Sequence, residues 1–397
     1  MNVLKPGRKK YYIIAGEASG DLHGSNLVAA LKQLDTNADI RGWGGDKMQL
    51  AGMELVKHYR ELAFMGFVEV VKNLGTILKN LNFCKEDIRQ FQPDVLVLID
   101  YPGFNLRMAR WAKQQQIKVV YYISPQVWAW KENRVKMMKQ CIDKMLVILP
   151  FEKEYFRNKW NWDVTYVGHP LIEEIAKKQS IGSSLVINGG EGEAHQKPVV
   201  ALLPGSRKQE IEKKLPVMLE VSKAFPDCQF VVAQAPSLDT SFYEVYTSHY
   251  PNVSIVNNRT YDLLMQSAAA LVTSGTATLE TALFGVPEVV CYKGSKISYQ
   301  IARRVIRISY ISLVNLIMNR EVVKELIQGD MTTENLIHEL DRLLNNPVRQ
   351  KQLQQDYATL KDLLSSGGNA SEKAAAAIVS LISDNGPDNN EDNRQQK

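Results

Sequence analysis

One short pattern occurs near the start of the chain and again near its middle, and it constrains the fold more than any other feature. Residues 11–32 run from an apolar segment (YYIIA) through a glycine-serine turn (GEASGD) into an amphipathic segment. Residues 199–223 repeat this order with VVALL, PGSR and a charged run of helical pattern. A buried strand that leads through a small-residue turn into a helix presents backbone N–H groups to an anion. The repetition predicts two nucleotide-binding folds that face a shared cleft.

Apolar runs alternate with helical patterns in both halves. The first half includes residues 94–99, 119–123 and 144–149, and the second includes residues 199–203, 229–233, 253–256, 270–273 and 288–292. Continuous apolar runs are typical of strands that helices cover on both faces. We therefore expect an α/β protein with two doubly wound, Rossmann-like domains. Neither turn has the spacing of a dinucleotide fingerprint or a P-loop, so those two classes lose their main support.

The domain boundary is predicted near residue 170. Residues 1–170 form the first domain and residues 171–344 the second, while the helical segment at about 345–383 packs back on the first domain or contacts a second chain. Residues 178–197 are expected to form a surface insertion. The Asn/Asp-rich tail, residues 384–397, has the composition of a disordered segment.

Composition and charge indicate which ligands and which cellular compartment suit the chain. A net charge of +5 suits an anionic substrate or a membrane surface and does not by itself imply nucleic acid. The four cysteines are scattered without a C-x-x-C pair, as in proteins of a reducing compartment. No apolar run approaches the roughly 20 residues that span a bilayer. We expect a cytoplasmic protein that touches a membrane without crossing it.

Polar residues follow the predicted strands, where open α/β sheets bind their ligands. These residues, expected to converge on one cleft, are Glu17, Ser19 and Asp21 after the first strand, Asp100 after DVLVLI, Gly205, Ser206 and Arg207 after VVALL, and Ser274, Gly275, Thr276 and Glu280 after ALVT. Arg207 beside a helix N-terminus suits a diphosphate leaving group, although it could also be a surface arginine. Glu280 could accept hydrogen bonds from a ribose diol, or belong to a helix cap with Thr276 or Thr278.

Asp100 is a candidate general base, with an ordinary turn residue as the alternative. Glu17 and Asp21 are rival acids, and His23 is more typical of a structural residue. Outside the tail there is no Asp-x-Asp pair, and no histidine pair has metal-ligand spacing. We therefore expect no metal and no cofactor, with charge neutralisation by Arg207, helix N-termini and basic residues of the segment 299–307.

Two segments are amphipathic, residues 64–81 and residues 301–317. Each is either a helix that faces the core or an acyl-chain groove or membrane-surface face.

The chain resembles the lipid-A-disaccharide synthases, which are inverting glycosyltransferases of the GT-B type. The matching stretches are AGEASGD (15–21), LAFMGFVEV (62–70), PDVLVLIDYPGFN (93–105), YYISPQVWAWKENRV (121–135), ILPFEKEYF (148–156), VGHPL (167–171), LLPGSRKQEI (202–211), TSGTATLE (273–280) and YISLVNLIMNREVVKELIQ (310–328). SPQVWAW together with LLPGSR is far more specific than any single glycine motif.

The resemblance implies a reaction and roles. UDP-2,3-diacylglucosamine would be the donor and 2,3-diacylglucosamine 1-phosphate the acceptor, at the inner face of the inner membrane of a Gram-negative-type bacterium. Asp100 would be the base on the acceptor 6-hydroxyl and Arg207 would serve the diphosphate. The turn 274–276 with Glu280 would hold the nucleotide, and Glu17, Ser19, Asp21 and Asn315 would line the cleft.

The chain departs from the family pattern at several positions. Tyr101 and Gly103 stand where the commoner form has Ala and a second Asp, and Val314 stands where a proline is usual. The first two bear on how Asp100 is oriented. The alternatives are another UDP-GlcNAc-using GT-B enzyme, such as a muramyl-lipid transferase or a 2-epimerase, and a non-catalytic lipid- or nucleotide-binding protein.

Overall fold

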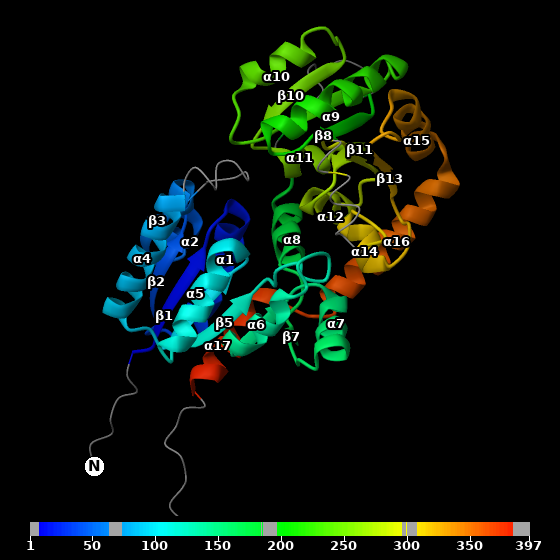
Figure 1. Cartoon of the computed structure of the whole chain (residues 1–397). Helices are drawn as coiled ribbons and strands as arrows, with labels where there is room; N and C mark the ends of the chain where they lie inside the picture. The colour runs from blue at the N-terminus through cyan, green and yellow to red at the C-terminus, as the bar shows by residue number, and fades with distance from the viewer. Residues whose placement is uncertain are drawn as a thin grey trace, which may run out of the picture. The chain divides into compact units, whose positions relative to one another are not determined.

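The computed structural model describes residues 8–62, 74–183, 185, 197–295, 299 and 308–383. The chain divides into two compact units (Figure 1). Unit 1 comprises residues 1–170 and 366–397, and unit 2 comprises residues 171–365. Each unit is built on one parallel sheet, so the expected pair of Rossmann-like domains is confirmed.

Unit 1 contains a seven-stranded sheet in the order β3-β2-β1-β4-β5-β6-β7. The strands are β1 (Lys10–Ala15), β2 (Asp39–Gly44), β3 (Glu54–His58), β4 (Val95–Ile99), β5 (Lys118–Tyr122), β6 (Lys144–Val147) and β7 (Thr165–Tyr166). The strand order reverses between β1 and β4, which pair in parallel with Ala15 opposite Ile99. This is the switch point at which such sheets bind ligands.

The helices of unit 1 cover both faces of its sheet. They are α1 (Ala18–Leu34), α2 (Asp46–Leu50), the 3₁₀ turn η1 (Tyr59–Leu62), α4 (Leu74–Phe91), α5 (Pro102–Gln114), α6 (Arg134–Cys141), α7 (Pro150–Trp160) and α17 (Ala370–Ser383). Successive strand residues point to opposite faces. Tyr11 and Ile13 therefore pack in a core with α1 and α17, whereas Tyr12 and Ile14 pack in a second core with α4 and α5.

Unit 2 contains a six-stranded parallel sheet in the order β10-β9-β8-β11-β12-β13. Its strands are β8 (Val199–Leu203), β9 (Gln229–Gln234), β10 (Val253–Asn257), β11 (Ser267–Thr273), β12 (Glu288–Tyr292) and β13 (Lys324–Ile327). Its helices are α8 (Leu171–Ile181), α9 (Lys208–Val221), η2 (Ser222–Ala224), α10 (Thr240–Thr247), α11 (Thr260–Leu264), α12 (Thr276–Leu283), α14 (Leu313–Met318), α15 (Thr333–Asn345) and α16 (Pro347–Ser365). The switch point lies between β8 and β11, where Leu203 pairs with Val272.

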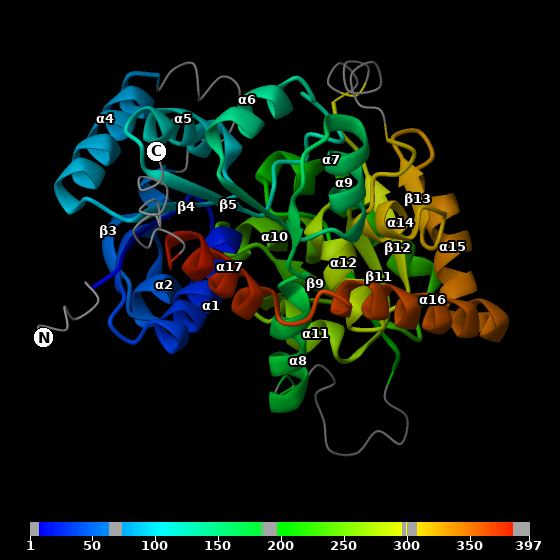
Figure 2. The same cartoon turned by 90° about the horizontal axis from the view of Figure 1, so that it is seen from below.

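The C-terminal chain returns to unit 1 at Ser366, later than the expected return near residue 345, because α16 packs in the core of unit 2. Helix α17 then lies along α1, which Figure 2 shows. The returning chain passes very close to the segment that leaves unit 1. A Cβ on Gly367 would lie 2.3 Å from the Cα of Gly168, so this crossing needs glycine.

Several sequence expectations fall outside the described residues. These are the tail 384–397, most of the insertion 178–197, residues 64–73 of the first amphipathic segment and residues 301–307 of the second. Helix α8 runs to Ile181, so the first residues of the expected insertion are helical. Among the described helices, none combines the length and apolar character that a membrane span requires.

Candidate functional site

The turn after β1 and the turn after β4 leave the sheet of unit 1 side by side, because Ala15 and Ile99 are paired. Glu17 precedes α1 and is half-buried, Ser19 is exposed, and Asp100 follows β4 directly. The carboxyl end of this strand pair therefore carries the predicted acidic residues Glu17 and Asp100 together.

Asp100 and Tyr101 both have left-handed backbone conformations, with φ of 45° and 48°. Such conformations cost a non-glycine residue on the order of 1–3 kcal/mol and persist only where surrounding contacts enforce them. Here the Asp100 carbonyl accepts hydrogen bonds from Tyr121 Oη at 2.6 Å and Asn105 Nδ2 at 2.8 Å. The Asp100 N–H donates to the Tyr122 carbonyl. These contacts fix the direction in which the strand ends.

Asn105 and Tyr121 did not appear among the predicted site residues. Asn105 is fully buried in α5, and its Nδ2 also donates to the Ile99 carbonyl at 3.1 Å. The sequence feature that could have indicated Asn105 is its amide side chain, which stands among mostly apolar and basic residues of a helical segment. Both residues position Asp100 through its backbone.

The Asp100 carboxyl has a perturbed pKa. Burial, followed by the negative charge of nearby Glu17, raises this pKa to about 6, against the lowering effect of a hydrogen bond from the Tyr101 backbone. A general base works best with a pKa near the operating pH. A raised pKa of this kind agrees with the predicted role of Asp100 as a general base, which stays a prediction.

The Tyr101 ring lies directly on the backbone of Gly16. A Cβ built on Gly16 would lie 2.3 Å from Tyr101 Cδ1, and the ring also stacks on Phe104 at 5.9 Å between centroids. The Tyr101 ring is therefore accommodated by the absence of a side chain at Gly16.

Asp21, a predicted rival acid, is buried and serves as the cap of another helix. Its carboxylate accepts hydrogen bonds from the backbone N–H groups of Gly45, Lys47 and Met48, at 2.8, 3.2 and 3.0 Å. This arrangement satisfies the N-terminus of α2. His23 is also buried, near His169, whose pKa burial lowers to about 3. The described contacts of Asp21 are those of an anchor for α2.

In unit 2, the PGSR and TSGT turns leave the neighbouring strands β8 and β11. Gly205 has a φ of 125°, which favours glycine, and Ser206 is exposed. Arg207 immediately precedes α9 with its side chain 65 % exposed, and its Nη1 lies 3.7 Å from Glu210 Oε1. The guanidinium is thus accessible at a helix N-terminus, an arrangement that favours an anion.

Glu280 lies in the first turns of α12 and is half-buried. Its Oε1 accepts a hydrogen bond from Tyr261 Oη at 2.8 Å, and burial raises its pKa. Neither Thr276 nor Thr278 is the N-cap residue of α12, so the alternative of a threonine side-chain cap is wrong. The cap residue is Gly275, with φ of 148° and no side-chain cap, while Thr276 is exposed and Thr278 Oγ1 donates to the Gly275 carbonyl.

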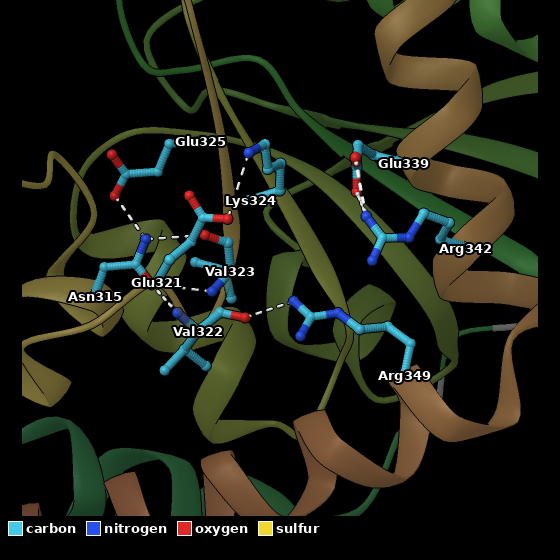
Figure 3. Close-up of polar contacts among 9 residues, drawn as sticks. All are labelled: Asn315, Glu321, Val322, Val323, Lys324, Glu325, Glu339, Arg342 and Arg349. Atoms are coloured by element: carbon cyan, nitrogen blue, oxygen red, sulfur yellow. Dashed lines mark hydrogen bonds and ion pairs between the residues drawn. The ribbon is translucent and has the colours of Figure 1, made fainter.

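Asn315, expected to line the cleft, is fully buried and binds its own unit (Figure 3). Its Oδ1 accepts from the N–H groups of Val322 and Val323 at 2.7 and 2.9 Å, and its Nδ2 donates to Glu325 Oε1 at 2.9 Å. Both ends of the amide are therefore used to join α14 to β13.

Glu325 extends this network to the TSGT turn. Its carboxylate accepts from the N–H groups of Ile311 and Ser312, and the Ile311 carbonyl accepts from Ser274 Oγ at 2.8 Å. Ser274 is thereby held by the segment 310–328 whose sequence matched the family. Asn315 thus contributes to the site by supporting Ser274 through this network.

Among the described residues, no group of three or more His, Cys, Asp or Glu side chains has the arrangement of a metal site. The basic residues proposed in the segment 299–307 lie outside the described residues.

Comparison with known proteins identifies extensive similarity. The sequence model of the family described as lipid-A-disaccharide synthetase matches residues 11–379. A lipid-A-disaccharide synthase of Syntrophus aciditrophicus is 40% identical over 380 residues, covering 94% of this chain and 98% of the relative. The synthase of Geobacter metallireducens is 39% identical over 379 residues, covering 94% and 97%.

Solved structures share the fold at low identity. A glycotransferase of kitacinnamycin superposes with a TM-score of 0.65 at 13% identity, covering 95% of this chain and 100% of the other. A putative UDP-N-acetylglucosamine 2-epimerase of Listeria monocytogenes superposes with a TM-score of 0.64 at 14% identity, covering 96% and 98%. These likenesses support the two-domain fold of the GT-B type and carry no further functional weight.

The contact between Gly16 and Tyr101 predicts the effect of a single methyl group. Gly16→Ala should destabilise unit 1 by about 1–3 kcal/mol, because the new Cβ overlaps the tyrosine ring. The same substitution in a Tyr101→Ala background should cost much less, since the ring is gone. Denaturant unfolding of the single and double variants measures the coupling.

Gly103→Ala is the matched control for this cycle. It lies in the same turn, and nothing surrounds a Cβ there within 4 Å, so its stability should be unchanged or slightly higher. Equal costs of Gly16→Ala in both backgrounds would show that the ring contact is not responsible.

Proposed function

The chain belongs to the lipid-A-disaccharide synthase family and is a glycosyltransferase, and we propose that Asp100 and Arg207 carry its reaction. The reaction transfers 2,3-diacylglucosamine from UDP-2,3-diacylglucosamine to the 6-hydroxyl of 2,3-diacylglucosamine 1-phosphate with inversion. The products are the β-1,6-linked disaccharide 1-phosphate of lipid A and UDP.

Asp100 would act as the general base on the acceptor. As the acceptor oxygen attacks the anomeric carbon, the hydroxyl proton passes to the Asp100 carboxylate and the bond from that carbon to the diphosphate breaks. The observation that carries this assignment is an acid with a pKa of about 6, held by an enforced turn at the switch point of unit 1. Glu17 supports it, because its charge adds to the effect of burial on the Asp100 pKa.

Arg207 would stabilise the charge that develops on the departing diphosphate. Its exposed guanidinium stands at the N-terminus of α9, beside the Gly205-Ser206 turn. Preorganised donors at a site of developing charge are often the largest single contribution to catalysis. Glu280 and the turn 274–276 would hold the nucleotide, so unit 2 would bind the donor and unit 1 the acceptor.

The substrates carry acyl chains, so we extend the proposal to a peripheral position at the inner face of the inner membrane. Helix α4 supports this in its described part, where Leu78 and Phe83 are 54% and 49% exposed. Exposed apolar side chains on an amphipathic helix suit acyl chains or a membrane surface. The net charge of +5 suits anionic lipid and the acceptor phosphate.

The test of this function is release of UDP from UDP-2,3-diacylglucosamine, with and without the acylated glucosamine 1-phosphate acceptor, in the presence of EDTA. We expect release that depends on the acceptor and is unaffected by the chelator. Absence of release, with free UDP-GlcNAc turned over instead, would assign the chain to a different UDP-sugar reaction.

The Asp100 pKa predicts the acidic limb of the pH profile. Because the base must be deprotonated, kcat/KM should fall as pH drops below about 6. Glu17→Gln should move this limb to lower pH, since removing the neighbouring negative charge lowers the Asp100 pKa.

Asp100→Asn should lose about 10²–10⁴ in kcat while still binding UDP. Wild-type turnover by Asp100→Asn would remove Asp100 from the mechanism.

Removal of the Arg207 guanidinium should slow the transfer step. Arg207→Ala is expected to reduce kcat by about 10²–10³, as for the loss of one donor to a developing anion. Lys208→Ala is the matched control, because it removes an exposed charge from the adjacent position. Steady-state kinetics distinguish the two, and similar small losses in both would argue against a specific role for Arg207.

A further inference from the structure

Lys214 is a buried lysine in the middle of α9, with only 3% of its surface exposed. Lysine is almost never buried to this extent without partners. Lys214 lies on the inner face of the helix, where the neighbouring residues Ile211, Leu215 and Met218 belong to the core of unit 2. An apolar side chain would fill this space without the cost of burying a charge.

The Lys214 ammonium lies where the two proposed nucleotide-binding turns meet. Its Nζ donates a hydrogen bond to Thr273 Oγ1, on the last residue of β11 before the TSGT turn. A Cβ built on Gly205 would lie 3.3 Å from the same Nζ, which places the ammonium directly behind the PGSR turn. Figure 1 shows α9, β8 and β11 close together in unit 2.

The only carboxylate paired with Lys214 among the described residues is shared. Glu210 Oε2 lies 3.8 Å from Lys214 Nζ, and Glu210 Oε1 lies 3.7 Å from Arg207 Nη1. One negative charge therefore stands between two cations along one face of α9. Burial lowers the pKa of Lys214 and Glu210 raises it, so the carboxylate favours the charged ammonium.

We propose that Lys214 is a positioning residue for the donor diphosphate. Its ammonium attracts the diphosphate from behind the PGSR turn, and the same group holds the PGSR turn and the TSGT turn together. The inference rests on the proposed function, which puts the diphosphate at these turns. The ammonium places positive charge directly behind the turn where the proposed function puts the diphosphate. A buried charge needs no reorganisation to act on the ligand.

Three variants separate the charge of Lys214 from its hydrogen bond. Lys214→Met removes both and keeps a side chain of similar length. Lys214→Gln keeps a hydrogen-bond donor without the charge, and Thr273→Val keeps the charge without the hydroxyl acceptor. Calorimetry with UDP and with uridine reports the diphosphate contribution, because uridine lacks the phosphates.

We expect Lys214→Met and Lys214→Gln to weaken UDP binding about tenfold and to leave uridine binding nearly unchanged. Thr273→Val should change UDP binding by less than about threefold. If either Lys214 variant binds UDP as the wild type does, the inference is overturned. It is also overturned if UDP and uridine binding weaken equally, since that pattern indicates a structural role alone.

The wild-type measurement separates this inference from the proposed function. If the wild-type chain does not bind UDP, the donor site itself is wrong and the role of Lys214 falls with it. If the wild-type chain binds UDP and Arg207→Ala weakens it while the Lys214 variants do not, the proposed function stands and only the role of Lys214 is removed.

Discussion

Parallel pairing of two strand pairs, β1 with β4 and β8 with β11, is the constraint on which the rest of the structure depends. Each pair joins segments that are tens of residues apart, and each marks the point where its sheet reverses strand order. Two turns that are distant in sequence therefore emerge next to each other in each unit. The polar residues proposed for the reaction lie on or just after one of these four turns, apart from Asn315 and Lys214.

The two switch points are held by different means. In unit 1 the strain of two left-handed residues at Asp100 and Tyr101 is offset by hydrogen bonds to the Asp100 carbonyl and by the tyrosine ring against Gly16. In unit 2 the TSGT turn is held by a hydrogen bond from Ser274 Oγ to the Ile311 carbonyl. The Ile311 backbone is in turn fixed by Glu325, which Asn315 binds. In both cases hydrogen bonds from polar side chains to backbone carbonyls fix a turn conformation that sheet pairing alone would leave free.

The electrostatic character of the two sites is opposite. Unit 1 offers the half-buried Asp100 carboxyl, whose pKa is raised by burial and by Glu17, which suits proton abstraction from an acceptor. Unit 2 offers the cations Arg207 and Lys214 on either side of the Glu210 carboxylate, which suits a departing diphosphate. This division suits a displacement that takes a proton from one substrate and releases an anion from the other. The family to which the chain belongs performs such a displacement.

The sequence by itself determined the strands that are apolar throughout, the two turns that follow them in each half, and the family, because these depend on local pattern and composition. It did not identify β2, β3, β7 or β13, whose residues are partly exposed or whose length is only a few residues. The roles of Asp21, Asn105, Asn315 and Lys214 were decided only by the tertiary structure. Asp21 caps a helix that begins 25 residues later, and Lys214 binds a hydroxyl 59 residues away. Partners at such separations follow from sheet pairing and helix packing, which no fixed spacing in the sequence encodes.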